Sequence, residues 1–282
     1  MFALEPIPRG TSRWWRLAPR CTNPACKGRT FLSSFKRRYS GINLAEEWYC
    51  GPECFEAAAA TKIRDLSAAQ GKAITRQGAR IPLGLLLLSR GILTTEQIRL
   101  VLNRQRETAE NFGDAAQELG FATPDQVTSA VAAQWACPVF PLGERQPAIP
   151  VRIPRRVLEL YRMLPVHFAE KERRLLIGFV NSVHHQILYT IEHMTSCVVA
   201  PCFITGQEFE RTLRATAPAD PRDSELLFDQ VMDAAEMAQI TRNYAVQLGS
   251  ARTRLGRCRD YLWARIWGRE REMDLLFRLA AS

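Results

Sequence analysis

Four of the eight cysteines lie in two closely spaced pairs, Cys21 with Cys26 and Cys50 with Cys54. Each pair falls in a stretch rich in Pro, Gly or Asn, residues that favour tight turns. Two turns that each present two thiolates suit the tetrahedral coordination of Zn²⁺. Four thiolates would fill the coordination shell and leave no position for a reactive water. We therefore expect a structural zinc ion rather than a catalytic one.

The elements around the cysteines must bring the two pairs together. The second pair leads directly into an alanine-rich segment typical of a helix, so Cys54 should lie near a helix N-terminus. Residues 14–66 should therefore form a zinc module that resembles a treble clef, with two cysteine turns, a hairpin and a helix. So short a segment buries too little apolar surface to fold alone, and a metal would supply the missing stability. Redox-active or merely buried cysteine pairs are the alternative.

Burial is also the expectation for the cysteines that stand alone. They lie in apolar surroundings, and they are Cys137, Cys197, Cys202 and Cys258. Other patterns that carry catalysis are absent from the sequence, which has no phosphate-binding loop of the pattern GxxxxGK(S/T), no HExxH and no GxSxG. We therefore expect a protein that is not an enzyme.

Three histidines close together in sequence are a weaker metal candidate. They are His184, His185 and His193. Adjacent histidines point to different faces of a helix, and no cysteine or acid stands at ligand spacing beside them. We therefore expect no metal at this position.

The formal net charge is +9, and most of the excess lies in the first 110 residues. Residues 1–60 carry nine basic and five acidic groups, and residues 61–110 carry nine and four. Such an excess favours an anionic partner such as nucleic acid, a nucleotide or an acidic protein. Lys36, Arg37 and Arg38 lie near aromatic residues and could contact phosphates and bases. Zinc-dependent nucleic-acid binding by this basic third is therefore the alternative function.

Runs of apolar residues, such as Leu85 to Leu88, are far too short to cross a bilayer. The first residues also lack the apolar core of a secretory signal. We therefore expect a cytoplasmic protein without membrane insertion, in a compartment that keeps thiols reduced.

Residues 82–105 and 111–134 repeat one pattern of glycine, threonine, glutamine and aliphatic residues. The matched pairs include Gly84 with Gly113, Gly91 with Gly120, and Gln105 with Gln134. Each copy predicts a short helix, a glycine turn and a longer helix. Thr94 or Thr95 would cap the first long helix and Thr123 the second. Two copies are too few for a solenoid but can pack as a pseudo-two-fold pair.

This repeated pattern resembles the MshEN-type domain at the N-terminus of type II secretion and type IV pilus assembly ATPases. The resemblance covers residues 78–214, because the chain continues after the repeat with a turn at 137–142, a helix and strands at 153–182, and a strand and helix at 198–213. The phosphate loop of those ATPases is missing, so the resemblance implies their N-terminal domain without the motor. It also implies a protein partner, with secretion or pilus machinery as the candidate.

Several domains of this family bind cyclic di-GMP, with one motif serving each half of the ligand. By resemblance, the contact residues here would be Leu83, Gly84, Gly91, Gln105, Phe112, Gly113, Gly120 and Gln134. Glycine lets the backbone approach a ligand closely, and glutamine can both donate to and accept from a guanine edge. The family's binding motif begins with arginine, whereas this chain has Pro82 and Asn111 there. Retention of the glycines and leucines for the turns and core alone is the alternative.

The chain as a whole predicts an α+β fold that is mainly helical. Residues 14–66 would be the zinc module, residues 76–135 the repeat, and residues 136–215 a small α/β subdomain with antiparallel strands. Residues 222–280 should form a hairpin of two amphipathic helices that breaks at Gly249. The apolar stripe of its second helix would be Leu255, Cys258, Leu262, Ile266, Met273 and Leu276. The function expected is that of a non-enzymatic cytoplasmic regulatory or adaptor protein that could sense cyclic di-GMP.

Overall fold

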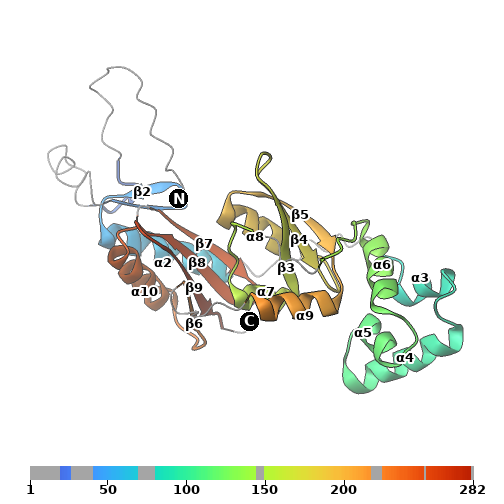
Figure 1. Cartoon of the computed structure of the whole chain (residues 1–282). Coiled ribbons are helices and arrows are strands. Elements are labelled where there is room, and N and C mark those ends of the chain that lie inside the picture. The colour runs from blue at the N-terminus through green and yellow to red at the C-terminus, as the bar shows by residue number, and fades with distance from the viewer. Residues whose placement is uncertain are drawn as a thin grey trace.

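The computed structural model is a mixed helix-and-sheet protein, as the sequence predicts (Figure 1). No helix in the parts of the chain that it describes is long and apolar enough to span a bilayer. The basic cluster of Lys36, Arg37 and Arg38 lies outside those parts. The described residues are 20–26, 41–68, 80–143, 149–216, 224–250 and 252–280.

Strands from residues 42–49 and 225–278 form a single six-stranded sheet in the order β2-β1-β7-β8-β9-β6. Its strands are β1 (Ile42–Leu44), β2 (Glu47–Tyr49), β6 (Glu225–Phe228), β7 (Arg252–Cys258), β8 (Tyr261–Trp267) and β9 (Glu272–Arg278). Strand β1 pairs in parallel with β7, which places Asn43 opposite Arg252. The repeat and the α/β subdomain are therefore inserted between two parts of one sheet (Figure 1).

Two helices cover one face of this six-stranded sheet (Figure 1). They are α2 (Pro52–Ala68) and α10 (Ala234–Gln247), which also pack against each other. Successive side chains of a β-strand point to opposite faces of its sheet, and β8 follows this rule. Leu262 and Ile266 accordingly join the core under the helices, whereas Tyr261 and Trp263 join the core of the inserted part. Both faces of the central strands are thus buried.

The predicted C-terminal helical hairpin is wrong. Its first half contains α10, but residues 252–278 form the antiparallel strands β7, β8 and β9. Because β8 is buried on both faces, its sequence lacks the polar and apolar alternation that marks a half-exposed strand. Its apolar residues then mimic helical spacing. The turns between the strands coincide with Arg259, which has a left-handed φ of 48°, and with Gly268.

The α/β subdomain contains a three-stranded sheet in the order β3-β4-β5. Strands β3 and β4 are antiparallel as predicted, but β5 runs parallel to β4. The intervening helix α8 makes the parallel connection, since parallel strands need a crossover. The elements are α7 (Arg155–Tyr161), β3 (Met163–Ala169), β4 (Arg174–Phe179), α8 (His185–Thr195), β5 (Val198–Phe203) and α9 (Gly206–Ala215).

The repeat consists of four helices at one end of the molecule (Figure 1). It contacts the α/β subdomain where its last helix, α6, packs against β5. The helices are α3 (Leu83–Ser89), α4 (Thr95–Thr108), α5 (Phe112–Glu118) and α6 (Pro124–Trp135).

One buried ion pair ties the C-terminal sheet to the segment that leads into α7. The Asp274 carboxylate on β9 accepts two hydrogen bonds from Arg265 on β8, each at 2.8 Å, and a third from Trp263 Nε1 at 2.7 Å. Arg265 also donates to the carbonyl oxygen of Arg152 at 2.7 Å. The side chains of Arg265 and Asp274 are only 3% and 1% exposed, so neither charge has water to stabilise it.

We expect Asp274→Asn to lower the free energy of unfolding by about 3–5 kcal/mol, because it leaves the Arg265 charge buried without a counter-charge. Urea denaturation would measure the loss. Arg278→Gln is the control, since Arg278 is exposed on the same strand. It should change the stability by less than about 0.5 kcal/mol. Equal stability of the two variants would show that the ion pair contributes nothing.

Candidate functional sites: a cysteine cluster and a two-fold repeat

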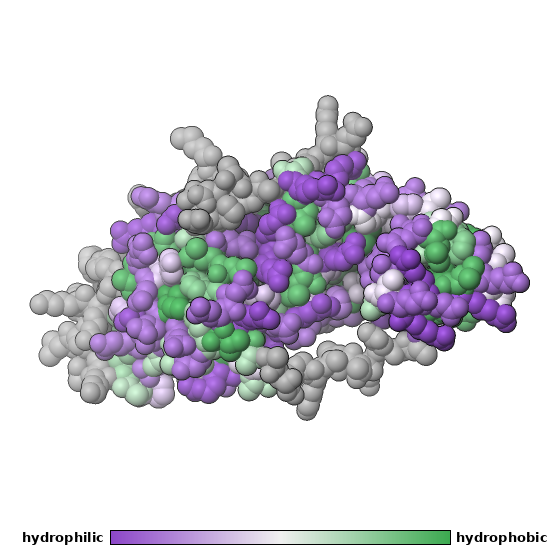
Figure 2. Space-filling view, turned by 90° about the horizontal axis from the view of Figure 1, so that it is seen from below, coloured by the Kyte–Doolittle hydropathy of each residue, from purple (hydrophilic) through white to green (hydrophobic). Residues whose placement is uncertain are grey.

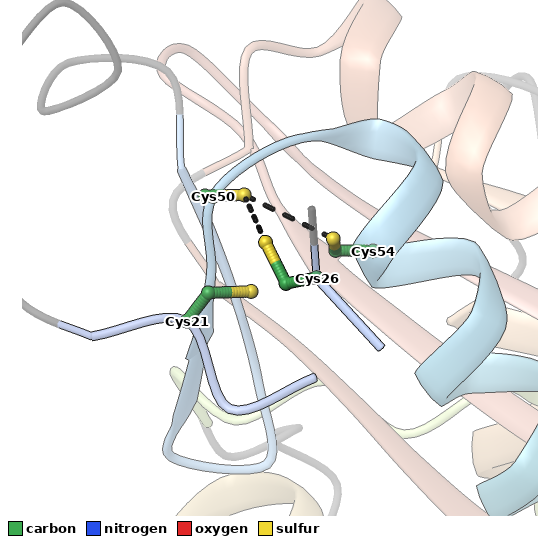
Figure 3. Close-up of side chains that lie close together, drawn as sticks. All are labelled: Cys21, Cys26, Cys50 and Cys54. Carbon is green, nitrogen blue, oxygen red and sulfur yellow. Dashed lines mark hydrogen bonds between the residues drawn. The ribbon is translucent and has the colours of Figure 1, made fainter. Parts of the chain in front are cut away.

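The four paired cysteines meet at one point (Figure 3). Their Sγ atoms all lie within 4.8 Å of one another, with Cys26 and Cys50 at 3.5 Å and Cys50 and Cys54 at 3.9 Å. In a tetrahedral site with Zn–S bonds of about 2.3 Å, the sulfurs lie about 3.8 Å apart. The cluster therefore has the size and the donor set that Zn²⁺ requires.

Short-range hydrogen bonds position the two pairs. Cys26 N–H donates to the carbonyl of Asn23 at 3.1 Å, which closes the first turn. Thr22 fastens this turn to β2, because its N–H and its hydroxyl both donate to the carbonyl of Trp48. Cys50 follows β2 directly, and Cys54 lies in the first turn of α2. The hairpin β1–β2, the second turn and the helix thus follow the predicted order.

Burial dominates the electrostatics of the cluster. It raises the pKa of the Cys54 thiol to about 12, and it also raises the pKa of the Cys50 thiol. Without a cation these thiols would therefore keep their protons at neutral pH. A zinc ion binds the thiolate form, so binding would release protons and reverse that preference.

Among the described residues, the four cysteines are the single group of three or more His, Cys, Asp or Glu side chains that could hold a metal ion. Of the three histidines, His184 accepts a hydrogen bond from Arg259 at 2.9 Å. The expected burial of the single cysteines is confirmed for three of them, and Cys137 is half-buried. The three buried cysteines are Cys197, Cys202 and Cys258.

The two copies of the repeat have the same local structure. Thr94 caps α4 and Thr123 caps α6, as predicted. In each cap the threonine side chain accepts from a backbone N–H three residues on, and a glutamine side chain returns the bond. Gly91 and Gly120 form the intervening turns with φ values of 68° and 70°, a region that glycine adopts without strain.

The two copies exchange partners across a pseudo-two-fold axis. Helix α3 packs on α6 and α4 packs on α5, while α3 and α5 cross at their glycines. A Cβ atom at Gly84 would lie 3.0 Å from the ring of Phe112, and one at Gly113 would lie 3.6 Å from Leu83. Both glycines are buried, so their small size lets the helices approach closely. These four residues, all predicted ligand contacts, are therefore brought together.

The glutamines that end the two copies make equivalent hydrogen bonds. Gln105 Nε2 donates to the carbonyl oxygen of Glu110 at 2.9 Å, just before the second copy begins. Gln134 Nε2 donates to the carbonyl oxygen of Ile81 at 2.7 Å, just before the first copy begins. The end of each copy thus fastens the start of the other. Sequence reasoning missed this, because a backbone carbonyl leaves no signal in the residue type.

The motif positions that lack arginine lie at helix starts. Pro82 and Asn111 are the residues before α3 and α5, and neither side chain caps its helix. Arg80 stacks on Trp135, with its guanidinium carbon 3.3 Å from the ring centre. Gly91 and Gly120 are exposed, and they lie in the turns rather than at the crossing of α3 and α5. The predicted contact residues therefore lie at the helix crossing, the two glutamine bonds and the two turns.

We expect protein purified without added metal to contain about one zinc per chain, because the four sulfurs fit a tetrahedral shell. Elemental analysis would measure it. The double change Cys50→Ser plus Cys54→Ser should abolish the zinc and lower the melting temperature, since β1 and α2 belong to the six-stranded sheet domain. Cys137→Ser, outside the cluster, is the control and should retain the metal. A zinc content that is unaffected by the double change would assign the metal elsewhere.

The two glutamine bonds should contribute to stability whether or not a ligand binds. We expect Gln105→Ala and Gln134→Ala each to lower the free energy of unfolding by about 0.5–1.5 kcal/mol. Thermal or urea denaturation would measure both. Gln186→Ala, at an exposed position in α8, is the control. Unchanged stability in both repeat variants would mean that these bonds do not hold the two copies together.

No protein-family model matches the chain. The type IV pilus assembly ATPase PilB of Thermus thermophilus is 23% identical over 129 residues, which are 45% of this chain and 14% of that ATPase. The chain thus spans about one seventh of the relative's length. Solved structures that share partial likeness are MshE with cyclic di-GMP, at 21% identity, and the N-terminal domain of XpsE, at 15%.

The MshE match covers 49% of this chain and 100% of the other, with a TM-score of 0.41. The XpsE match covers 47% and 91%, with a TM-score of 0.38. These matches are to a pilus assembly ATPase, to MshE and to the N-terminal domain of XpsE, and the repeated pattern within residues 78–214 resembles the MshEN-type N-terminal domain of type II secretion and type IV pilus assembly ATPases.

Proposed function

We propose that this protein is a non-enzymatic regulatory or adaptor protein, located in the cytoplasm. Its MshEN-like domain is inserted into a sheet domain that carries a structural Zn²⁺ at Cys21, Cys26, Cys50 and Cys54. The observation that carries the proposal is the reciprocal packing of the repeat, from which we infer a two-fold surface with residues of both copies. The cysteine cluster supports a structural role, because a shell of four thiolates leaves no position for a catalytic water.

Cyclic di-GMP is the ligand that this two-fold surface would suit best. The ligand carries two guanines and two phosphates related by two-fold symmetry, and the chain offers each motif position twice, with Leu83 in the first copy and Phe112 in the second at one of them. Binding would use Gln105 and Gln134 to read the guanine edges. Both amide groups already donate to backbone carbonyls, so the ligand would have to exchange those bonds. Affinity would therefore be lower than the number of contacts implies.

The missing arginine makes a direct test available. We expect Pro82→Arg to tighten binding of cyclic di-GMP about 10- to 100-fold, because a charge-assisted hydrogen bond contributes about 1.5–3 kcal/mol. Calorimetry would compare the wild type, Pro82→Arg, and Gln105→Ala plus Gln134→Ala. Gln186→Ala is the control, and thermal melting would verify that every variant is folded.

Two results would contradict the nucleotide proposal. If the wild type and the double glutamine variant bind equally well, the assignment of the site residues is wrong. If neither the wild type nor Pro82→Arg binds, the repeat is a scaffold for protein contacts, and fold symmetry alone accounts for the duplication.

A protein partner, with secretion or pilus machinery as the candidate, follows from the resemblance to the N-terminal domain of the ATPases. Nucleic-acid binding stays the alternative from the sequence. It rests on the basic N-terminal third, and Lys36, Arg37 and Arg38 lie outside the described residues. Charge alone does not distinguish these partners.

A further inference from the structure

The internal two-fold of the repeat makes α4 and α6 equivalent, yet their surfaces differ on one side. In α6, Thr128, Val131 and Ala132 are 5%, 4% and 3% exposed. Their equivalents in α4 are Arg99, Leu102 and Asn103, which are all exposed. These positions follow the spacing i, i+3, i+4, so the difference is confined to one helix face. By contrast, Ala130 and its equivalent Val101 are both fully buried.

The buried face of α6 is the face that packs against the α/β subdomain. Helix α6 packs against β5 of the α/β subdomain, and Trp135 extends this face to the ring of His185, with 6.3 Å between the ring centres. Beside it, Asp114 of α5 pairs with Arg162, at 3.7 Å, and accepts from Asn181. One half of the repeat therefore holds the α/β subdomain through a helix face and a neighbouring charge.

In the part of the chain that the structure describes, the equivalent positions of the other half are exposed. They are Leu85, equivalent to Asp114, together with Arg99, Leu102, Asn103 and Arg106 of α4. Leu85 is 52% exposed and Leu102 is 41% exposed. Figure 2 shows apolar surface bordered by hydrophilic side chains on the repeat, at the right-hand end of that view. We call these five residues the α4 face.

The side chains of the α4 face indicate the chemistry of a partner that could cover it. Thr128 and Ala132 are small and buried in α6, whereas the equivalent Arg99 and Asn103 of α4 are larger, polar and exposed. Two arginines seven residues apart lie on one side of a helix and bind carboxylates well, because the guanidinium group can donate two parallel hydrogen bonds. Leu102 lies between the two arginines along α4, and Leu85 of α3 is a further exposed apolar side chain. This combination suits an apolar surface that carries carboxylates.

We propose that the α4 face docks a partner protein whose contact surface combines apolar side chains with carboxylates. The proposal rests on the adaptor function given above and adds the surface and the chemistry of the partner. A second copy of the chain fits less well. The subdomain surface that a second copy would offer carries Arg162, and its own Asp114 already occupies it. Duplex DNA also fits less well, because Glu96 and Glu107 lie on the same helix as the arginines.

A designed peptide provides a direct probe. It would be an acidic amphipathic helix of about 20 residues, with leucines on one face and glutamates beside them. We expect fluorescence anisotropy to detect binding that weakens with salt. Arg99→Glu plus Arg106→Glu should weaken it at least tenfold, and Leu102→Ala about threefold or more. The control is Lys171→Glu plus Arg174→Glu, at exposed positions of the β3–β4 turn region, which should bind as the wild type does.

The outcomes separate the possible occupants. Amide shifts in NMR spectra that are confined to α3 and α4 on addition of the peptide would support the proposal. No binding, or equal binding by the charge-reversed variant, would overturn it. A tight complex with duplex DNA that the same charge reversal removes would also overturn the proposal. Self-association that is measured by ultracentrifugation and removed by the charge reversal would overturn it as well. A chain that binds the peptide but not cyclic di-GMP would support this proposal and contradict the nucleotide part of the proposed function.

Discussion

The pairing of β1 with β7 is the constraint on which the rest of the structure depends. It joins the segment that carries the cysteines to a sheet whose other strands follow the whole inserted part. The helices α2 and α10 can pack on each other only because this pairing places them on one face. The opposite face of the same sheet then supplies Tyr261, Trp263 and Leu276 to the core of the inserted part. A metal at the cysteines would stabilise the edge of this sheet as well as the short segment around it.

In the repeat, the apolar faces are buried by symmetric packing of the two copies. Neither copy buries its own apolar face, because its short helix packs on the long helix of the other copy. Gly84 is needed where the short helices cross, Gly113 where α5 meets Val127 of α6, and Gly91 and Gly120 where the chain turns. A repeated sequence of this kind can thus be maintained by packing alone. Any ligand or partner would act on a surface that the fold already requires.

The sequence was informative where one residue type has one local use. Threonine caps, turn glycines and paired cysteines each predict a local geometry without knowledge of the fold, and they are where the sequence places them. The three C-terminal strands were not predictable in this way. Helical spacing of their apolar residues arose because residues such as Leu262 and Trp263 are buried on opposite faces. The direction of β5 and the carbonyl partners of the glutamines depend on tertiary contacts, which leave no local pattern.

The insertion also has a consequence for how the chain folds during its synthesis. Strand β1 emerges from the ribosome early, but its partner β7 follows only after the repeat and the α/β subdomain have been made. Contacts between residues so distant in sequence form slowly, because a long loop must close first. The inserted part can fold before β7 is available to pair with β1 of the cysteine segment. A metal ion needs only the four cysteines within residues 21–54. During that interval it would hold this segment folded until the six-stranded sheet is complete.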